Sequence, residues 1–132
     1  MLVVDSSAWV AILRHEPEAR ALLEAITNAA TVHMSAASYV EVGAVIDGVR
    51  DPIASRRFDE LLEMFEVVVE PVPPGQARRA REAYRDFGRG SGHPARLNYG
   101  DVFSYALATE LRAPLLFKGT DFTHTDVIDA RA

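Results

Sequence analysis

Short runs of strand-forming residues alternate with helical segments along this chain, and this alternation constrains its fold more than any other feature. Apolar runs of three to five residues are typical of strands that are buried on both faces. The strands are predicted at residues 2–4, 31–35, 67–69 and 115–117, with a candidate fifth strand at 127–128. Helical spacing or capping residues predict the helices at residues 6–13, 18–28, 35–49, 52–65, 75–87 and 98–111.

Alternating strands and helices predict an α/β fold, a three-layer α/β/α sandwich around a mostly parallel central sheet. The chain has 132 residues, of which 48% are hydrophobic, so we expect one domain, residues 1–132, with a substantial core. In such folds, binding and catalytic sites form outside the carboxyl ends of the strands. Residues that follow the predicted strands are therefore the first candidates for a functional site.

Composition excludes several classes of protein. The chain contains no cysteine, which excludes disulfides, thiolate metal sites and cysteine nucleophiles. No stretch approaches the roughly 18 uncharged apolar residues of a membrane span, and Asp5 interrupts the start of the chain where a signal peptide would be apolar. His33, His93 and His124 are too scattered for a zinc site. We expect a cytoplasmic protein.

Charge is unevenly spread along the chain. The net charge of −5 argues against a protein that only binds phosphate backbones. Residues 76–96 nevertheless carry six arginines against two acids. This basic zone is compatible with a nucleic-acid enzyme that keeps a separate acidic site, but taken alone it is better explained as a solvated helix face.

Four acidic residues are singled out by their positions. Asp5 and Asp121 lie just past the ends of predicted strands, whereas Asp101 begins a predicted helix and Glu41 lies within one. The neighbours of Glu41 one helical turn away are small or apolar, so no adjacent cation would compensate its charge if it were buried. A partner from elsewhere in the fold, such as a metal ion, is then required.

Each of these acids also has a purely structural interpretation. Asp101 could form a capping pair with Asn98, and Glu41 could lie on an exposed helix stripe. Asp5 and Asp121 could simply stabilise turns. Several carboxylates gathered at one edge of a sheet could not all stay ionised without positive charge nearby, however. Oxygen ligands without cysteine favour Mg²⁺ or Mn²⁺, so the pattern indicates metal-assisted hydrolysis of a phosphodiester.

Four segments of the chain resemble the motifs of PIN domains. Residues 3–13 (VVDSSAWVAIL) resemble their opening strand and turn, in which the Asp is followed two residues later by Ser or Thr. Residues 35–46 (SAASYVEVGAVI) resemble the second motif, which is built around a helical Glu. Residues 97–108 (LNYGDVFSYALA) and 114–127 (PLLFKGTDFTHTDV) resemble the third and fourth. Their order and spacing match the VapC group of toxins along essentially the whole chain.

The resemblance implies a Mg²⁺-dependent endoribonuclease, with Mn²⁺ as a substitute metal, that is the toxin of a type II toxin–antitoxin system. It implies Asp5 and Asp101 as the main metal ligands, with Glu41 orienting or deprotonating the attacking water or binding metal through water. Asp121 would support a second metal or position the first, and Ser7 would hold the Asp5 rotamer through a hydrogen bond. The implied partners are an RNA substrate, a second copy of the chain in a homodimer, and a VapB-like antitoxin.

The chain departs from the family pattern in one place. Thr120 precedes Asp121 where many relatives have Asn, Asp or Gly, so Asp126 is an alternative candidate for the same role. Contact with the RNA backbone is predicted for cations near the third and fourth motifs, namely Arg85, Arg89, Arg96 and Lys118. For Lys118, a solvated position at a strand end is the alternative.

Two other functions stay open from the sequence alone. One is a catalytically inactive PIN module used for binding or as a scaffold, although the intact set of acids argues against it. The other is a phospho-receiver domain, which is also α/β and has a strand-end Asp and a late Lys such as Lys118. Receivers carry an acidic pair after the first strand, however, whereas this chain has Asp5-Ser6-Ser7.

Overall fold

A parallel β-sheet forms the centre of the molecule. The structure, a computed structural model, describes residues 1–131, and within them the sheet has four strands in the order β3-β2-β1-β4. Neighbouring strands all run parallel, and Val3 of β1 is aligned with His33 of β2 and Leu115 of β4. The strands are β1 (Leu2–Val4), β2 (Val32–Ser35), β3 (Val68–Glu70) and β4 (Leu115–Leu116).

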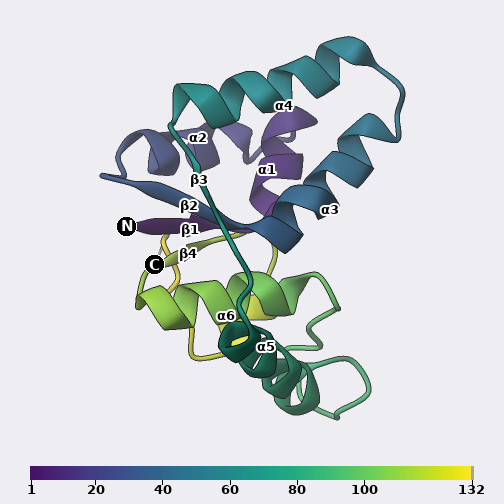
Figure 1. Cartoon of the computed structure of the whole chain (residues 1–132), viewed down its shortest axis with the longest axis vertical. Coiled ribbons are helices and arrows are strands. Elements are labelled where there is room, and N and C mark those ends of the chain that lie inside the picture. The colour runs from purple at the N-terminus through teal and green to yellow at the C-terminus, as the bar shows by residue number, and fades with distance from the viewer. Residues whose placement is uncertain (132) are drawn as a thin grey trace.

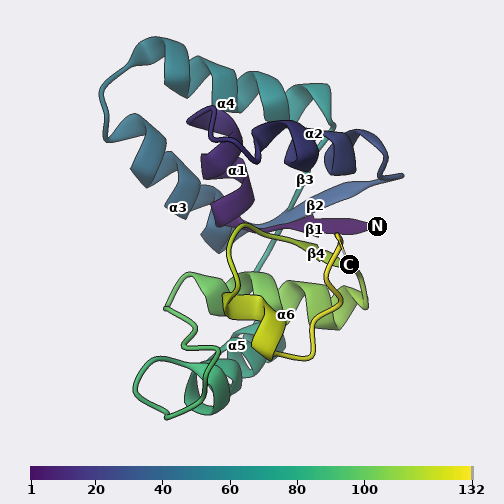
Figure 2. The ribbon, with the colours of Figure 1, turned by 180° about the vertical axis from the view of Figure 1, so that it is seen from behind.

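Helices cover both faces of this sheet (Figures 1 and 2). One face is covered by α1 (Ser6–Leu13), α2 (Ala19–Thr27), α3 (Ala36–Asp47) and α4 (Pro52–Met64). The opposite face is covered by α5 (Pro74–Phe87) and α6 (Asp101–Leu111), and a short 3-10 helix, η1 (Asp121–His124), follows β4. Within residues 1–131, no helix is both long and apolar enough to cross a membrane. The predicted α/β/α sandwich with a parallel sheet is confirmed.

Capping residues explain where helices begin. Asp51 caps α4 through a side-chain hydrogen bond, and Pro52 occupies its first turn. The cap of α1 is Asp5. Asp5 is the extended residue that leaves β1, so its carboxylate can accept a hydrogen bond from the Ser7 backbone. The first turn after the sheet therefore places an acid at the sheet edge.

Each face of the sheet has its own apolar core. Trp9, Leu22 and Met34 are completely buried in the core on the α1–α4 side. Leu107 and Leu115 are buried in the core on the α5–α6 side. Strands β1 and β4 contribute to both cores, because successive side chains of a strand point to opposite faces. These two strands therefore join the layers.

Two details of the predicted sheet are wrong. Strand β3 is not buried, since Val68 and Val69 are 43% and 40% exposed; β3 is the edge strand beyond β2. Residues 127–128 form no strand, and the chain beside them makes only an isolated bridge between Leu115 and Asp129. Apolar composition alone does not reveal whether a run is covered, because that depends on its place in the sheet.

Trp9→Ala is expected to lower the free energy of unfolding by about 3–5 kcal/mol, because a cavity is left where the indole packs against Phe58. The measurement is urea unfolding followed by circular dichroism. Ile53→Ala is the control, because Ile53 is 74% exposed, and it should cost less than about 0.5 kcal/mol. Equal losses in the two variants would contradict this picture of the core.

Candidate active site at the carboxyl edge of the sheet

An acidic pocket opens at the carboxyl edge of the sheet. Strands β2 and β3 lie on one side of β1 in the sheet, and β4 lies on the other side. The chain segments that follow β1 and β4 therefore diverge at this edge. The pocket at this divergence has a volume of about 300 Å³. Its wall includes Asp5, Ser6, Ser7, Glu41, Asn98 and Asp101.

Asp5 is completely buried directly after β1. Its Oδ2 accepts hydrogen bonds from the backbone N of Ser7 at 3.0 Å and from the Ser7 hydroxyl at 2.6 Å. Among residues 1–131, no group completes a hydrogen bond to the other oxygen, Oδ1. Burial raises the pKa of Asp5, and the nearby hydroxyls of Ser104 and Ser7 offset only part of that effect. A cation beside Oδ1 would satisfy this buried oxygen.

Glu41 reaches the same pocket from α3 and is half-buried. The Ser6 hydroxyl, at the start of α1, donates a hydrogen bond to Glu41 Oε1. Gly100, directly before α6, leaves room for this carboxylate, since a Cβ there would lie 2.6 Å from Glu41 Cδ. The Gly100 backbone is helical, with φ −70° and ψ −36°, which any residue adopts. Space for Glu41, and not backbone conformation, therefore accounts for the glycine.

Asp101 enters the pocket as the first residue of α6. Its Oδ2 accepts a hydrogen bond from Asn98 N, and Asn98 Oδ1 accepts one from Asp101 N, both at 2.9 Å. This is the reciprocal capping pair that the sequence suggests, although α6 begins at Asp101, with Gly100 and not Asn98 in the cap position. Burial raises the pKa of Asp101 to about 7, and repulsion from the three other candidate acids adds to the shift.

The fourth predicted acid, Asp121, is exposed at the start of η1. Its negative charge acts on Asp101, although Asp121 does not form part of the pocket wall. Asp126, the alternative candidate, accepts a hydrogen bond of 2.6 Å from the Tyr105 hydroxyl and faces a different hollow, beside the C-terminal end of α6. The structure thus gathers three of the four acids, with Asp121 beside them and Asp126 apart.

The cations predicted to contact RNA differ in their surroundings. Lys118 lines the acidic pocket, but its Nζ is paired with Glu16 at 2.8 Å. Arg85, Arg89 and Arg96 are exposed and lie outside this pocket. The first of these is on α5, and the other two are in the loop that joins α5 to α6.

Several residues of the pocket region were not identified from the sequence, among them Ser6, Gly100 and Arg14. Ser6 and Gly100 are each adjacent in sequence to a predicted acid, which is a signal that could have identified them. Arg14 lines the pocket from the end of α1. It carries no local signal, because only the direction of α1 brings it to the pocket.

The donor set of this pocket fits a hard divalent cation. Carboxylate, hydroxyl and amide oxygens line it. Within the part of the chain that the structure describes, no three acidic or histidine side chains already converge on a single point. Mg²⁺ needs only one or two carboxylates and keeps several waters, so Asp5 and Asp101 meet its requirement. The unpartnered oxygen of Asp5 and the raised pKa of Asp101 both mark places where positive charge is stabilising.

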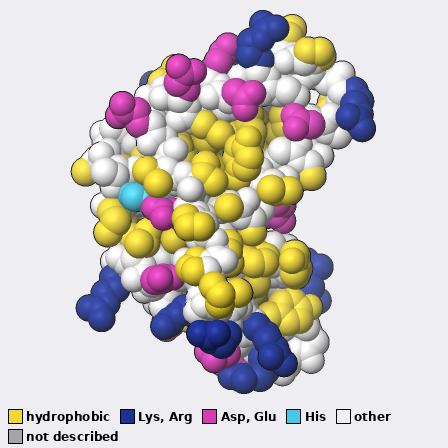
Figure 3. Space-filling model, viewed as in Figure 1, with side chains coloured by type: hydrophobic (Ala, Val, Ile, Leu, Met, Phe, Trp, Pro, Cys, Tyr) yellow, Lys and Arg dark blue, Asp and Glu magenta, His cyan; other side chains and the backbone are white. Residues whose placement is uncertain are grey.

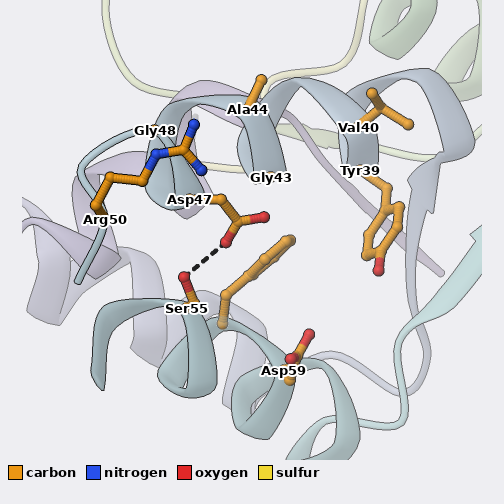
Figure 4. A pocket seen from close by; sticks show the side chains of 10 residues that line it. Tyr39, Val40, Gly43, Ala44, Asp47, Gly48, Arg50, Ser55 and Asp59 are labelled. Carbon is orange, nitrogen blue, oxygen red and sulfur yellow. Dashed lines mark hydrogen bonds between the residues drawn. The ribbon is translucent and has the colours of Figure 1, made fainter. Parts of the chain in front are cut away.

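A larger hollow, of about 560 Å³, lies between α3 and α4 (Figure 4). The rings of Tyr39 and Phe58 meet there with centroids 5.8 Å apart. Its two acids are not brought together. Asp47 accepts a hydrogen bond of 2.7 Å from Ser55, whereas Asp59 lies apart from this pair, farther along α4. Without convergent carboxylates, this hollow offers no arrangement for the same chemistry.

Fold and acidic pocket together define an α/β/α protein with an oxygen-lined site of the kind that supports metal-assisted hydrolysis. A model of the PIN domain matches residues 2–128. Ribonuclease VapC28 from Mycobacterium tuberculosis is 60% identical over 126 residues, which cover 96% of this chain and 95% of that protein. Ribonuclease VapC42 from the same species is 52% identical, with 96% of each chain covered.

Solved structures share the fold. VapC20 from Mycobacterium tuberculosis, a toxin that cleaves the sarcin–ricin loop, has a TM-score of 0.77 at 16% identity, covering 98% of both chains. VapBC2 from Rickettsia felis, bound to a DNA fragment from its promoter, has a TM-score of 0.72 at 15% identity, covering 96% of this chain and 95% of that one. The chain belongs to the PIN-domain family, and within it to the VapC group. The phospho-receiver alternative is therefore wrong.

Asp101 is expected to make the metal-free protein less stable as the pH rises from about 4 to 7. An unfolded Asp releases its proton near pH 3.9, about three units below the pKa of Asp101 in the folded protein, so the folded state holds an extra proton in this window. Asp101→Asn should flatten this decline when urea unfolding is measured in EDTA at several pH values. An unchanged pH slope would contradict the raised pKa.

Proposed function

We propose that this chain, with residues 1–132 acting as one domain, is a Mg²⁺-dependent endoribonuclease and the toxin of a type II toxin–antitoxin pair. The observation that carries the proposal is its 60% identity to a VapC ribonuclease over 96% of the chain. The acidic pocket supplies the chemistry that such an activity requires. A divalent ion held by carboxylates lowers the pKa of bound water and stabilises the charge that develops on the phosphate.

Asp5 and Asp101 are the proposed metal ligands. Ser7 holds Asp5 through Oδ2, which leaves Oδ1 available for an ion. Asn98 likewise holds Asp101 through Oδ2. Because both side chains are fixed before any ion arrives, binding requires little reordering of the chain. Oxygen donors favour Mg²⁺ over softer metals, with Mn²⁺ as the expected substitute.

Glu41 is proposed to orient the attacking water and accept its proton. Its carboxylate is held by Ser6 and lies against Gly100, the residue before Asp101. A general base must lie within hydrogen-bond reach of the water that it deprotonates, so this placement beside a metal ligand suits the role. Asp121 is proposed to position the ion through water, since it is exposed and acts on Asp101 by charge.

A second copy of this chain and a VapB-like antitoxin are the proposed protein partners. Val40 and Tyr99 are 66% and 77% exposed, and together with Phe103 they line an apolar hollow that also borders Glu41. Exposed apolar patches of this kind mark interaction surfaces. An apolar rim beside an acidic pocket suits both a homodimer and an antitoxin whose basic segment enters the pocket.

The purified chain, free of partners, is expected to cut total bacterial RNA into discrete fragments in Mg²⁺ but not in EDTA. Asp5→Asn should reduce the cleavage rate by at least about 100-fold, because it removes a metal-binding charge while keeping the side-chain shape. Asp59→Asn is the matched control, since Asp59 is an exposed acid on α4, and it should leave the rate unchanged. The measurement is gel analysis of the RNA over time.

An inactive binding module would give a different result. In that case the folded wild-type protein would cut no RNA, and Mg²⁺ would not raise its thermal midpoint. Cleavage that persists in EDTA or in Asp5→Asn would contradict the metal-dependent site instead.

Gly100→Ala is expected to reduce RNA cleavage by about 100-fold while leaving the thermal midpoint unchanged or higher. The new Cβ would displace the Glu41 carboxylate, but a helical backbone tolerates alanine. Gly43→Ala is the control, because its Cβ would meet only Asp47 Oδ2 at an ordinary 3.7 Å. A fully active Gly100→Ala protein would show that the position of Glu41 is not important.

A further inference from the structure

The outward face of α5 carries a cluster of basic residues that the acidic pocket does not use. Arg78, Arg81 and Arg85 follow one another at helical spacing, and together with Tyr84 and Glu82 they line a surface hollow of about 490 Å³. The opposite face of α5 is buried through Gln76, Ala80 and Ala83, and α5 packs against α6. We call Arg78, Arg81, Tyr84 and Arg85 the α5 arginine face.

Positive charge gathers on this face in a protein whose net charge is −5. Figure 3 shows basic side chains gathered at the end of the molecule where α5 lies, whereas over α4 at the opposite end acids are interspersed with further basic side chains. Among residues 1–131, neither Arg78 nor Arg81 forms an ion pair. The Arg85–Asp86 pair is exposed, with side chains 70% and 55% accessible, so solvent screens it. Charge of this kind attracts a polyanion.

Tyr84 distinguishes among polyanions. It is 41% exposed in the middle of the arginines, where its ring packs into neither apolar core. Single-stranded nucleic acids are bound by combining basic side chains for the phosphates with aromatic rings on which bases stack. A hollow of this volume is also within the range that holds a small ligand such as one nucleotide. An acidic peptide would use the arginines but not the ring.

The end of α5 is joined closely to the acidic pocket. Leu97 N donates to Phe87 O at 2.9 Å and Arg89 N donates to Leu97 O at 3.0 Å, so the last turn of α5 is bonded to the segment that leads into α6. Arg85 lies in that last turn. Asn98 of the pocket directly follows Leu97, and Asp101 comes three residues after Asn98. An RNA strand whose scissile phosphate lies at Asp101 can therefore continue along α5.

We propose that the α5 arginine face binds a single-stranded RNA segment that flanks the cleavage point, holding its phosphates with Arg78 and Arg81 and stacking one base on Tyr84. This rests on the proposed ribonuclease function and names the surface that sets the affinity for the substrate. It assigns RNA binding to Arg78, Arg81 and Tyr84 of α5, in addition to the loop residues Arg89 and Arg96 that the sequence suggested.

The test measures binding of a fluorescent single-stranded RNA to the full chain in EDTA by anisotropy, over a series of KCl concentrations. Arg78→Gln with Arg81→Gln should weaken binding and flatten the plot of log affinity against log salt by about 1.4, or about 0.7 for each lost contact. Arg56→Gln with Arg79→Gln removes the same charge from exposed sites outside the hollow, and it should leave the slope unchanged. Tyr84→Ala should weaken binding about tenfold without changing the slope, and Tyr84→Phe should restore it.

The proposal is overturned if both double variants change the slope equally, if Tyr84→Ala binds as well as the wild type, or if a polyglutamate peptide competes as strongly as unlabelled RNA. Circular dichroism establishes that each variant is folded.

Cleavage assays in Mg²⁺ separate this result from the proposed function. Wild-type protein that binds RNA but never cuts it contradicts the function alone, whereas an active Arg78→Gln, Arg81→Gln enzyme with unchanged KM and salt slope contradicts the α5 face alone. The expected result is a higher KM with kcat retained.

Discussion

Parallel pairing of β1 with β2 on one side and β4 on the other is the constraint on which the rest of the structure depends. Only three residues long and completely buried, β1 has both of its edges paired. Parallel strands cannot be joined by tight turns, so the chain returns through helices that cover both faces. The strands also end at a common edge, which is where Asp5 leaves β1 with its N–H bonded to Leu116 O at 2.9 Å.

The acidic pocket at this edge concentrates like charge at a cost to folding. Burial opposes the ionised forms of Asp5 and Asp101, and repulsion from neighbouring acids adds to it at Asp101. The hydrogen bonds from Ser7 and Asn98 compensate only in part. A glycine at position 100 serves the same site, since it gives up helix stability to leave space for Glu41. These features make sense if a divalent cation completes the pocket, because its charge stabilises what the polypeptide alone leaves unfavourable.

Charge is separated over the molecule in a way that suits a nucleic-acid substrate. A uniformly basic surface would neutralise the acids that hold a metal ion, whereas a uniformly acidic one would repel the phosphates. Here the acids gather at the carboxyl edge of the sheet. The arginines gather along α5, the helix that ends where the loop beginning at Gly88 leads on to the acidic pocket. Lys118, a cation in the wall of the acidic pocket, is paired with Glu16 and Glu18.

The sequence by itself determined the layers of this fold, because strand and helix periodicity and caps such as Asp51 are local properties of the chain. Its motifs also identified Asp5, Glu41 and Asp101 as candidates, since Asp5 follows a predicted strand, Asp101 begins a predicted helix and Glu41 lies within an apolar one. Only the tertiary structure decided that β3 is an exposed edge and that Asp121 lies beside the pocket instead of in its wall. Strand order, ion pairs and the space before α6 arise from contacts between residues far apart in sequence, and no local pattern encodes those contacts.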